Sequence, residues 1–327
     1  MIELARERGV GRAARTCWVA GCETLAVRNR ATASFVALGL IWGSNFIFMK
    51  WASETITAGQ ITLLRVLCGF LPIFAYAAIR RVFSRRHIWH VHHFFVMSVL
   101  ATSAYYFAFA AGTSLLPSGI AGALSGAIPL FSFVSAAVLL RSEQITFLRL
   151  LGVLIGFGGV LLIARPWTTD SPVDMTGVLY MLIGSASVGL SFVYAKKFLS
   201  NLAIPPAALT TYQIGLALLT LAVVTDLDGI TALGGDLKAL SGLVIGLGIL
   251  GTGIAYILYY FIVDQLGAIT ASSATYIPPV IALAIGWLLV HEPLDILDGA
   301  AILLILTGVL VLRLPAGHAN PRQRPSQ

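Results

Sequence analysis

The chain has 327 residues, of which 58% are hydrophobic and 11% are charged. Soluble globular domains carry about 25% charged residues, so a chain with so few charges cannot cover an apolar core of this size in water. A water-soluble fold is excluded, and embedding in a membrane is the simplest alternative. The net charge of +7 does not indicate nucleic-acid binding, because the basic residues lie in short segments between apolar runs.

Residues 1–30 are polar and basic, with six arginines. Their apolar stretch is too short for the core of a signal peptide. We expect a mobile basic tail in the cytoplasm, although a translation start placed too far upstream would leave the same segment. The three cysteines, Cys17, Cys22 and Cys68, match neither a disulfide framework nor a set of metal ligands. We expect no bound metal and no cofactor.

Ten apolar runs follow the tail, each close to the roughly 20 helical residues that span a bilayer. The runs are continuous rather than alternating, which favours helices over a β-barrel. Short connections leave no room for a soluble domain, and residues 314–327 form a second cytoplasmic tail. The expected limits are 32–52, 58–79, 92–113, 118–140, 146–164, 175–195, 206–225, 240–262, 268–290 and 296–313.

The distribution of lysine and arginine predicts the orientation. With the N-terminus in the cytoplasm, 17 of the 21 basic residues fall on the inner side. Arg165 and Lys238 fall outside, and Lys50 and Arg65 lie within spans. Cytoplasmic loops carry the excess of basic residues, so we expect both termini on the cytoplasmic face of the inner membrane and an even number of helices.

An internal duplication organises the chain. Sliding the sequence by 149 residues places Pro129 on Pro278 and Glu143 on Glu292, and 159–161, Gly-Val-Leu, falls on the identical tripeptide at 308–310. Near the start of each half, 42–50 resembles 188–196, with Gly43, Phe46 and Lys50 repeated as Gly189, Phe192 and Lys196. Each half has five helices, so the second enters the membrane in the opposite sense. We predict an all-α polytopic membrane protein with ten transmembrane helices as two inverted five-helix repeats.

These features resemble the two EamA repeats of the drug/metabolite transporter superfamily. The resemblance rests on Trp-Gly-Ser-Asn-Phe-Ile-Phe-Met-Lys at 42–50, on Arg65, and on the paired prolines and glutamates, and it covers about residues 34–313. It implies repeats at 31–164 and 175–313, a central cavity between them, and transport across the cytoplasmic membrane. One departure is that the sixth helix lacks the Trp and Asn of the first; another is that Gln213 stands near the counterpart of Arg65.

The prolines Pro129 and Pro278 mark one set of candidate cavity residues. A proline inside a helix frees a backbone carbonyl, which in hydrocarbon needs a partner or must line a cavity. Ser125, Ser272 and Thr275 lie nearby and can supply that partner or bind substrate. A packing kink without any cavity is the alternative. Glu143 and Glu292 fall at helix ends, where a capping role suits them better than proton relay.

Charged and aromatic residues form the second set. Arg65 lies a third of the way into the second helix, where a cation is costly and must face protein or water. It can meet a substrate carboxylate or pair structurally with backbone carbonyls, and Lys50 can face the cavity or snorkel to the interface. Trp42, Asn45, Tyr106 and Tyr256 can give a cavity its apolar walls and oriented polar groups. The histidine-rich segment at 87–93 is interpreted as an interfacial loop rather than a metal site.

A secondary transporter for a small metabolite, such as an amino acid or a related amphipathic compound, fits these features, and we expect alternating access and export. The expected partners are a small-molecule substrate and the lipid bilayer, with no nucleic acid, and a homodimer stays open. A membrane-embedded enzyme or a receptor without transport activity is the alternative. The enzyme would need a reactive constellation such as paired acids, and a receptor would need larger loops or tails.

Overall fold

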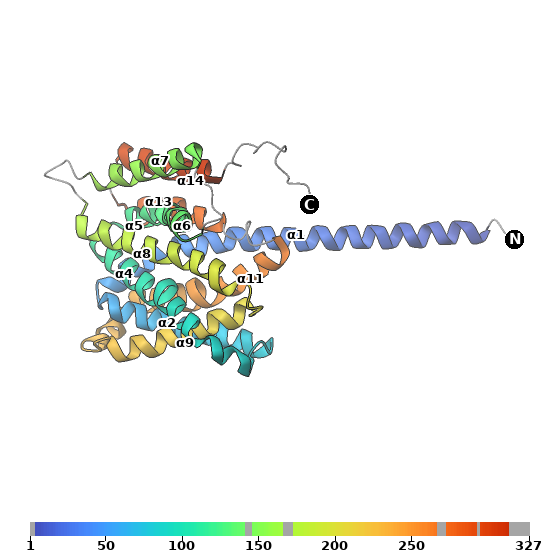
Figure 1. Cartoon of the computed structure of the whole chain (residues 1–327), viewed down its shortest axis with the longest axis horizontal. Coiled ribbons are helices and arrows are strands. Elements are labelled where there is room, and N and C mark those ends of the chain that lie inside the picture. Colours follow the sequence, from blue (N-terminus) through green and yellow to red (C-terminus); the bar gives the residue numbers. More distant parts are fainter. Residues whose placement is uncertain (1–3, 141–145, 166–172, 267–272, 293–294, 314–327) are drawn as a thin grey trace, which may run out of the picture.

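A computed structural model describes residues 4–140, 146–165, 173–266, 273–292 and 295–313 (Figure 1). Every regular element in these ranges is helical. Eight helices are long and apolar enough to cross a membrane, and the shorter apolar helices Ala274–Leu289 and Ile296–Val311 complete the ten expected spans. The all-α polytopic architecture is therefore confirmed.

The first helix, α1 (Leu4–Ser53), is longer than expected and projects well beyond the bundle (Figure 1). Its membrane-compatible part begins at Asn29, close to the expected start. Residues 4–28 continue the same helix because ten of them are Ala or Arg, which favour helices, and none is proline. The boundary expected near residue 31 is thus a change in polarity and not the beginning of a helix.

The remaining elements follow in chain order. The first half continues with α2 (Ala58–Ile79), η1 (Arg85–His90), α3 (Val91–Ser98), η2 (Val99–Ser103), α4 (Ala104–Leu115), α5 (Ser118–Leu124), η3 (Ser125–Ala127), α6 (Ile128–Leu139) and α7 (Phe147–Ala164). The second half comprises α8 (Met175–Tyr194), η4 (Ala195–Leu199), α9 (Pro206–Val224), η5 (Ile230–Gly235), α10 (Leu237–Ser241), η6 (Gly242–Ile254), α11 (Ala255–Leu266), η7 (Ser273–Tyr276), α13 (Ile277–Leu289) and α14 (Ile296–Arg313). The third span therefore runs from η1 to α4, the fourth from α5 to α6, and the eighth from α10 to α11.

Polar caps fix the ends of several spans. Thr57 and Gln60 form a capping box at the start of α2. Asp174 caps α8, and the backbone N–H groups of Gly177 and Thr176 hold the pKa of its carboxyl below its usual range. Glu292 accepts hydrogen bonds from the backbone N–H groups of Ser118 (2.7 Å) and Gly119 (2.9 Å) at the start of α5. The capping role expected for Glu292 is confirmed, and Glu143 lies outside the described residues.

The expected helix breaks at the prolines occur in both halves. The short 3₁₀ turn η3 precedes α6, whose first turn contains Pro129. The 3₁₀ turn η7 precedes α13 in the same way, and Pro278 lies in its first turn. Proline is tolerated at this position because the first N–H groups of a helix have no carbonyl partner within the helix.

Most contacts between helices occur twice in the bundle. Replacing each helix of a contact with its counterpart from the other half gives the second contact of the pair. Helix α1 packs on α13 as α8 packs on α6, and α1 packs on α11 as α8 packs on α4. Helix α2 packs against η6 as α9 packs against α3 and η2. The contacts α2–α9 and α7–α14 join counterpart helices directly, and α5–α13 joins the fourth span to the ninth. Figure 1 shows α7 and α14 at one edge of the bundle and α2 and α9 at the other. Each helix and its counterpart are five membrane crossings apart, and an odd number of crossings means that they run in opposite directions. The paired contacts are therefore those of an inverted repeat.

Two counterpart glycines allow one pair of these approaches. A Cβ atom at Gly43 would lie 3.3 Å from the Pro278 carbonyl oxygen at the start of α13. A Cβ atom at the counterpart Gly189 would lie 2.8 Å from the Ser132 nitrogen in α6. In each half, therefore, a glycine on the first helix packs against the proline-containing turn of a fourth helix.

Candidate functional site

Arg65 is the centre of the polar site inside the bundle. It lies on α2, and only 4% of the residue is exposed. Its guanidinium carbon is 3.8 Å from the centre of the Tyr106 ring on α4, and Nη1 is 3.9 Å from the sulfur of Met49. With the Asn45 amide oriented to satisfy both its groups, its Oδ1 accepts a hydrogen bond from Arg65 Nη2 (3.2 Å) and its Nδ2 donates to the Ile41 carbonyl (3.2 Å). All these partners are neutral, and Arg65 forms no ion pair within the described residues.

Thr252 is the fourth neutral partner and comes from the other half. Its Oγ1 accepts a hydrogen bond from Arg65 Nε (3.1 Å) and donates to the Leu247 carbonyl (2.9 Å). Thr252 lies in η6, a π-helical segment rich in glycine. Wide π turns are frequent at functional sites. Here the glycines let η6 approach α2 closely, because a Cβ at Gly253 would lie 2.8 Å from the Pro72 side chain.

The second repeat contains a neutral version of the same contact. Gln213 is the eighth residue of α9, as Arg65 is of α2, and its Nε2 donates to Thr102 Oγ1 (2.8 Å). Thr102 lies in the π-helical segment η2 and is fully buried. We name Arg65–Thr252 the outer polar contact and Gln213–Thr102 the inner polar contact, after the expected orientation. Each joins the second helix of one half to the third span of the other.

An aromatic cluster adjoins the Arg65 site through Tyr106. Tyr106 packs in a cluster with Tyr105, Tyr256 and Tyr260, contributed by α4 and α11. Trp42 lies one turn inward of Asn45 on α1, and its ring centre is 6.2 Å from that of Tyr259. The structure thus brings together Trp42, Asn45, Arg65, Tyr106 and Tyr256 around one part of the bundle.

The other candidate residues lie apart from Arg65. Lys50 Nζ donates to the Ser114 carbonyl (3.0 Å) at the end of α4, a contact between two helix ends. Ser125 is buried, and its hydroxyl donates to the Gly122 carbonyl (2.5 Å) one turn earlier, which is a local structural role. Pro129 is half-buried and Pro278 is buried at their respective helix breaks, with half-buried Thr275 in η7. Ser272 lies outside the described residues.

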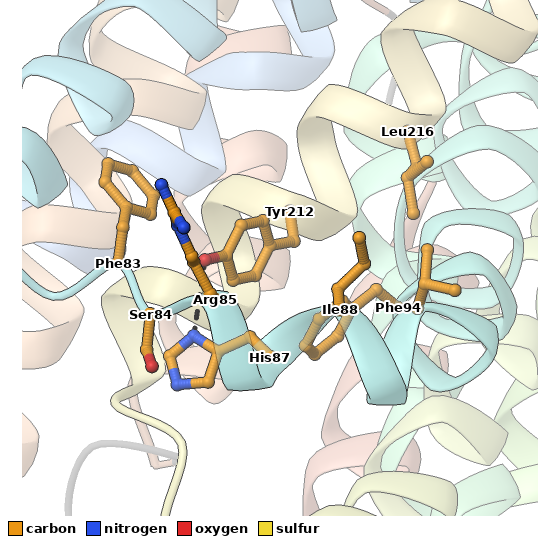
Figure 2. A pocket seen from close by; sticks show the side chains of 9 residues that line it. Phe83, Ser84, Arg85, His87, Ile88, Phe94, Tyr212 and Leu216 are labelled. Atoms are coloured by element: carbon orange, nitrogen blue, oxygen red, sulfur yellow. Dashed lines mark hydrogen bonds between the residues drawn. The ribbon is translucent and has the colours of Figure 1, made fainter.

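A distinct groove lies at the edge of the bundle where the connection after α2 leads into α3, and not at Arg65. It has a volume of about 780 Å³ and is lined by the connection after α2, the start of α3 and the neighbouring part of α9 (Figure 2). His87 Nδ1 lies 3.2 Å from the Tyr212 hydroxyl across this groove, and His93 Nδ1 lies 2.7 Å from that of Tyr194. Across the described residues no group of three or more His, Cys, Asp or Glu side chains is arranged to hold a metal ion.

The two threonines of the polar contacts were missed from the sequence. Thr102 and Thr252 are 150 residues apart, one more than the offset that relates the prolines. Their nearly equivalent positions in the two repeats could have marked them as a pair. However, a buried threonine in an apolar helix usually donates a hydrogen bond to the backbone of its own helix. What distinguishes these two is the partner across the interface, which only the packing supplies.

The chain matches known transporters over most of its length. The model of the EamA-like transporter family matches residues 30–165 and again 175–314. An "uncharacterized transporter" of Archaeoglobus fulgidus is 27% identical over 83% of this chain and 94% of the relative. The transporter YoaV of Bacillus subtilis is 25% identical over 84% of this chain and 94% of its own length.

A solved structure, described as "Crystal structure of protein", agrees at the level of fold. It matches 88% of this chain and 97% of its own with a TM-score of 0.55 at 20% identity. The inner membrane transporter YedA of Escherichia coli, 25% identical over 61% of this chain, places a relative in a membrane. Two matched repeats and ten apolar helices lead to one conclusion: the chain is a multi-pass membrane transporter that belongs to the EamA-like transporter family.

Proposed function

We propose that this transporter moves a small metabolite with an anionic group across the cytoplasmic membrane by alternating access. The observation that carries the substrate class is Arg65, a nearly fully buried cation whose partners among the described residues are all neutral. The family and the relatives support transport itself, and the site supports the kind of ligand. The protein is proposed to act as a transporter and not as an enzyme.

The energetic argument compares the buried charge with its partners. Removing an ion from water costs several kcal/mol even after relaxation of the protein. A cation–π contact returns about 0.5–2 kcal/mol, and a hydrogen bond involving a charged group about 1.5–3 kcal/mol. A ligand carboxylate at ~4 Å would add about 4 kcal/mol at an effective dielectric constant near 20. A site of this kind favours an anion over a neutral analogue of the same shape.

The aromatic residues restrict the rest of the ligand. Tyr106 presents an apolar ring face to the guanidinium, Tyr256 packs in the same cluster as Tyr106, and Trp42 contacts Tyr259. This combination suits a compound with an anionic end and an apolar body, such as an amino acid or a related amphipathic compound. Half-buried rings on the inner side of Arg65 also support loading from the cytoplasm, so we propose export as the direction.

The two polar contacts supply a physical basis for alternating access. Both are closed in this structure, with Thr252 and Thr102 fully buried. Opening the outer side would break Arg65–Thr252, and opening the inner side would break Gln213–Thr102. An anion that replaces Thr252 at Arg65 would favour one of these states. No Asp or Glu lies near the middle of any expected span, so we propose uniport or exchange without a carboxylate proton relay.

Transport by purified protein in liposomes tests the proposal. The variant Arg65→Gln removes the charge and retains polarity, and Lys50→Gln removes a cation that bonds to a backbone carbonyl instead. For an anionic substrate found by screening, we expect Arg65→Gln to lower uptake about 10- to 100-fold, the weight of one charged hydrogen bond. Uptake of a neutral analogue should change much less, and Lys50→Gln should preserve the preference.

Three results would contradict the proposal. Equal losses for anionic and neutral compounds in Arg65→Gln would mean that Arg65 is structural. Hydrolysis without uptake would favour the enzyme alternative. A steep rise of wild-type uptake with an imposed pH gradient, corrected for substrate protonation, would contradict the uncoupled mechanism.

A further inference from the structure

The groove at the edge of the bundle has a polar end and an apolar end. In Figure 2, Ser84, Arg85 and His87 lie together at one end with the ring of Phe83, and Ile88, Phe94 and Leu216 lie at the other. The Tyr212 ring lies between the two groups, with its hydroxyl toward His87. The volume of about 780 Å³ falls within the range of about 300–1,000 Å³ that is usual for ligand sites.

The two ends differ in depth along the membrane normal. Arg85 begins η1, in the connection that follows α2, so the polar end lies at the membrane surface. Tyr212 lies beside His87, and Leu216 lies four residues further along α9, about 6 Å deeper, since a helix rises about 1.5 Å per residue. The groove therefore runs from the interface toward the hydrocarbon, in the direction that a lipid takes.

The polar end is strongly basic. Arg80, Arg81, Arg85 and Arg86 are all exposed and surround the end of α2 and the start of η1. No Asp or Glu occurs between residues 58 and 140 or within α9, so none of the elements that line the groove carries a negative charge. Within the described residues, the Arg85 guanidinium has no hydrogen-bond or ion-pair partner, and it lies beside the Phe83 ring at this end of the groove (Figure 2).

We propose that this groove binds an anionic glycerophospholipid of the inner leaflet. The phosphate would lie at Arg85, and an acyl chain would run past Tyr212 toward Phe94 and Leu216. Basic pockets between transmembrane helices on the cytoplasmic side are suited to such headgroups. A soluble phosphate compound would use only Arg85, whereas a lipid also contacts the apolar residues at the other end of the groove, so a lipid fits the groove better.

Native mass spectrometry of the purified, detergent-solubilised protein tests the assignment. The probes are phosphatidylglycerol and phosphatidylcholine with identical acyl chains, together with free glycerol phosphate as a competitor. Arg85→Glu reverses the charge in the groove. Arg30→Glu makes the same change of net charge at an exposed position on another span. Equal elution volumes and melting temperatures would establish that both variants are folded.

We expect wild type and Arg30→Glu to retain phosphatidylglycerol about tenfold more than phosphatidylcholine, a difference of one charge-assisted contact. Arg85→Glu should retain both lipids equally, and glycerol phosphate should not displace the bound lipid. Equal retention of the two lipids by wild type would overturn the proposal, as would an equal loss in both variants. Displacement by glycerol phosphate would assign the groove to a soluble anion instead and would also refute a lipid site.

Discussion

Replacing Thr252 with valine should open the outer side of the transporter more often. Valine keeps the shape of threonine and removes the hydroxyl that accepts from Arg65 Nε at 3.1 Å. Thr252 is fully buried, so no water can replace that hydroxyl while the outer side stays closed. In an outward-open state, water would reach Arg65 and satisfy the same N–H group.

The expected size follows from the cost of an unsatisfied buried donor, about 1–3 kcal/mol. That cost falls on states with the outer polar contact closed, so the population of the outward-open state should rise about 5- to 150-fold. Thr102→Val removes the acceptor of Gln213 Nε2, 2.8 Å away, and should favour the inward-open state. The second shift should be smaller, because Gln213 is neutral and the unpaired amide costs less than a guanidinium N–H.

Cysteine labelling can measure both shifts. In a background without the three native cysteines, reporters are placed at Thr62 and Thr210, which lie one turn before Arg65 and Gln213 and are both buried. Thr252→Val should speed labelling of position 62 by an impermeant maleimide from the outside. Thr102→Val should speed labelling of position 210 from the inside. Faster labelling at both positions in one variant would indicate a general loosening of helix packing. Unchanged labelling rates at both positions would refute the role of the polar contacts in gating.

Three other predictions concern the scaffold and its orientation. Gly189→Val should destabilise the folded protein by about 1–3 kcal/mol or prevent folding, because the new side chain would meet the Ser132 nitrogen and the Ile128 carbonyl of α6. Gly158→Val is the control, because a Cβ atom at Gly158 has nothing within 4 Å and should be tolerated. Melting temperatures in detergent compare the two variants. Glu292→Ala should destabilise the protein by about 1–2 kcal/mol through loss of the α5 cap while leaving the pH dependence of uptake unchanged, and a flattened pH profile would favour a proton-relay role instead. A cysteine at the exposed position Ser84 should resist an impermeant reagent in intact cells and react after permeabilisation; labelling in intact cells would invert the topology.

Much of the architecture was predictable because its determinants are local in sequence. An apolar run long enough to cross a bilayer must satisfy its backbone within itself, so each run forms a helix whatever its neighbours are. The breaks before Pro129 and Pro278 were predictable for a similar reason, since a proline lacks the N–H that an internal helical position needs. The duplication and the five-helix halves then implied that the repeats are inverted.

The site was only partly predictable, because its contacts depend on how faces of different helices meet. The cost of a buried cation marked Arg65 as unusual, but its sequence position favoured neither a substrate nor backbone carbonyls as its partner. The packing of η6 against α2 placed Thr252 beside it, and α4 placed the ring of Tyr106 beneath the guanidinium.

The same dependence on packing explains why some candidate residues lie close together and others do not. Lys50 and Arg65 are both cations within apolar helices, and the sequence left a role in the cavity open for each of them. Lys50 lies near a helix end, where it reaches the Ser114 carbonyl, whereas Arg65 lies deeper and faces four neutral groups from three other spans. The sequence by itself determined which segments cross the membrane and which positions carry charge. Only the tertiary structure decided what each charge contacts, because glycines such as Gly43, Gly189 and Gly253 set how closely the helices approach, and at which faces.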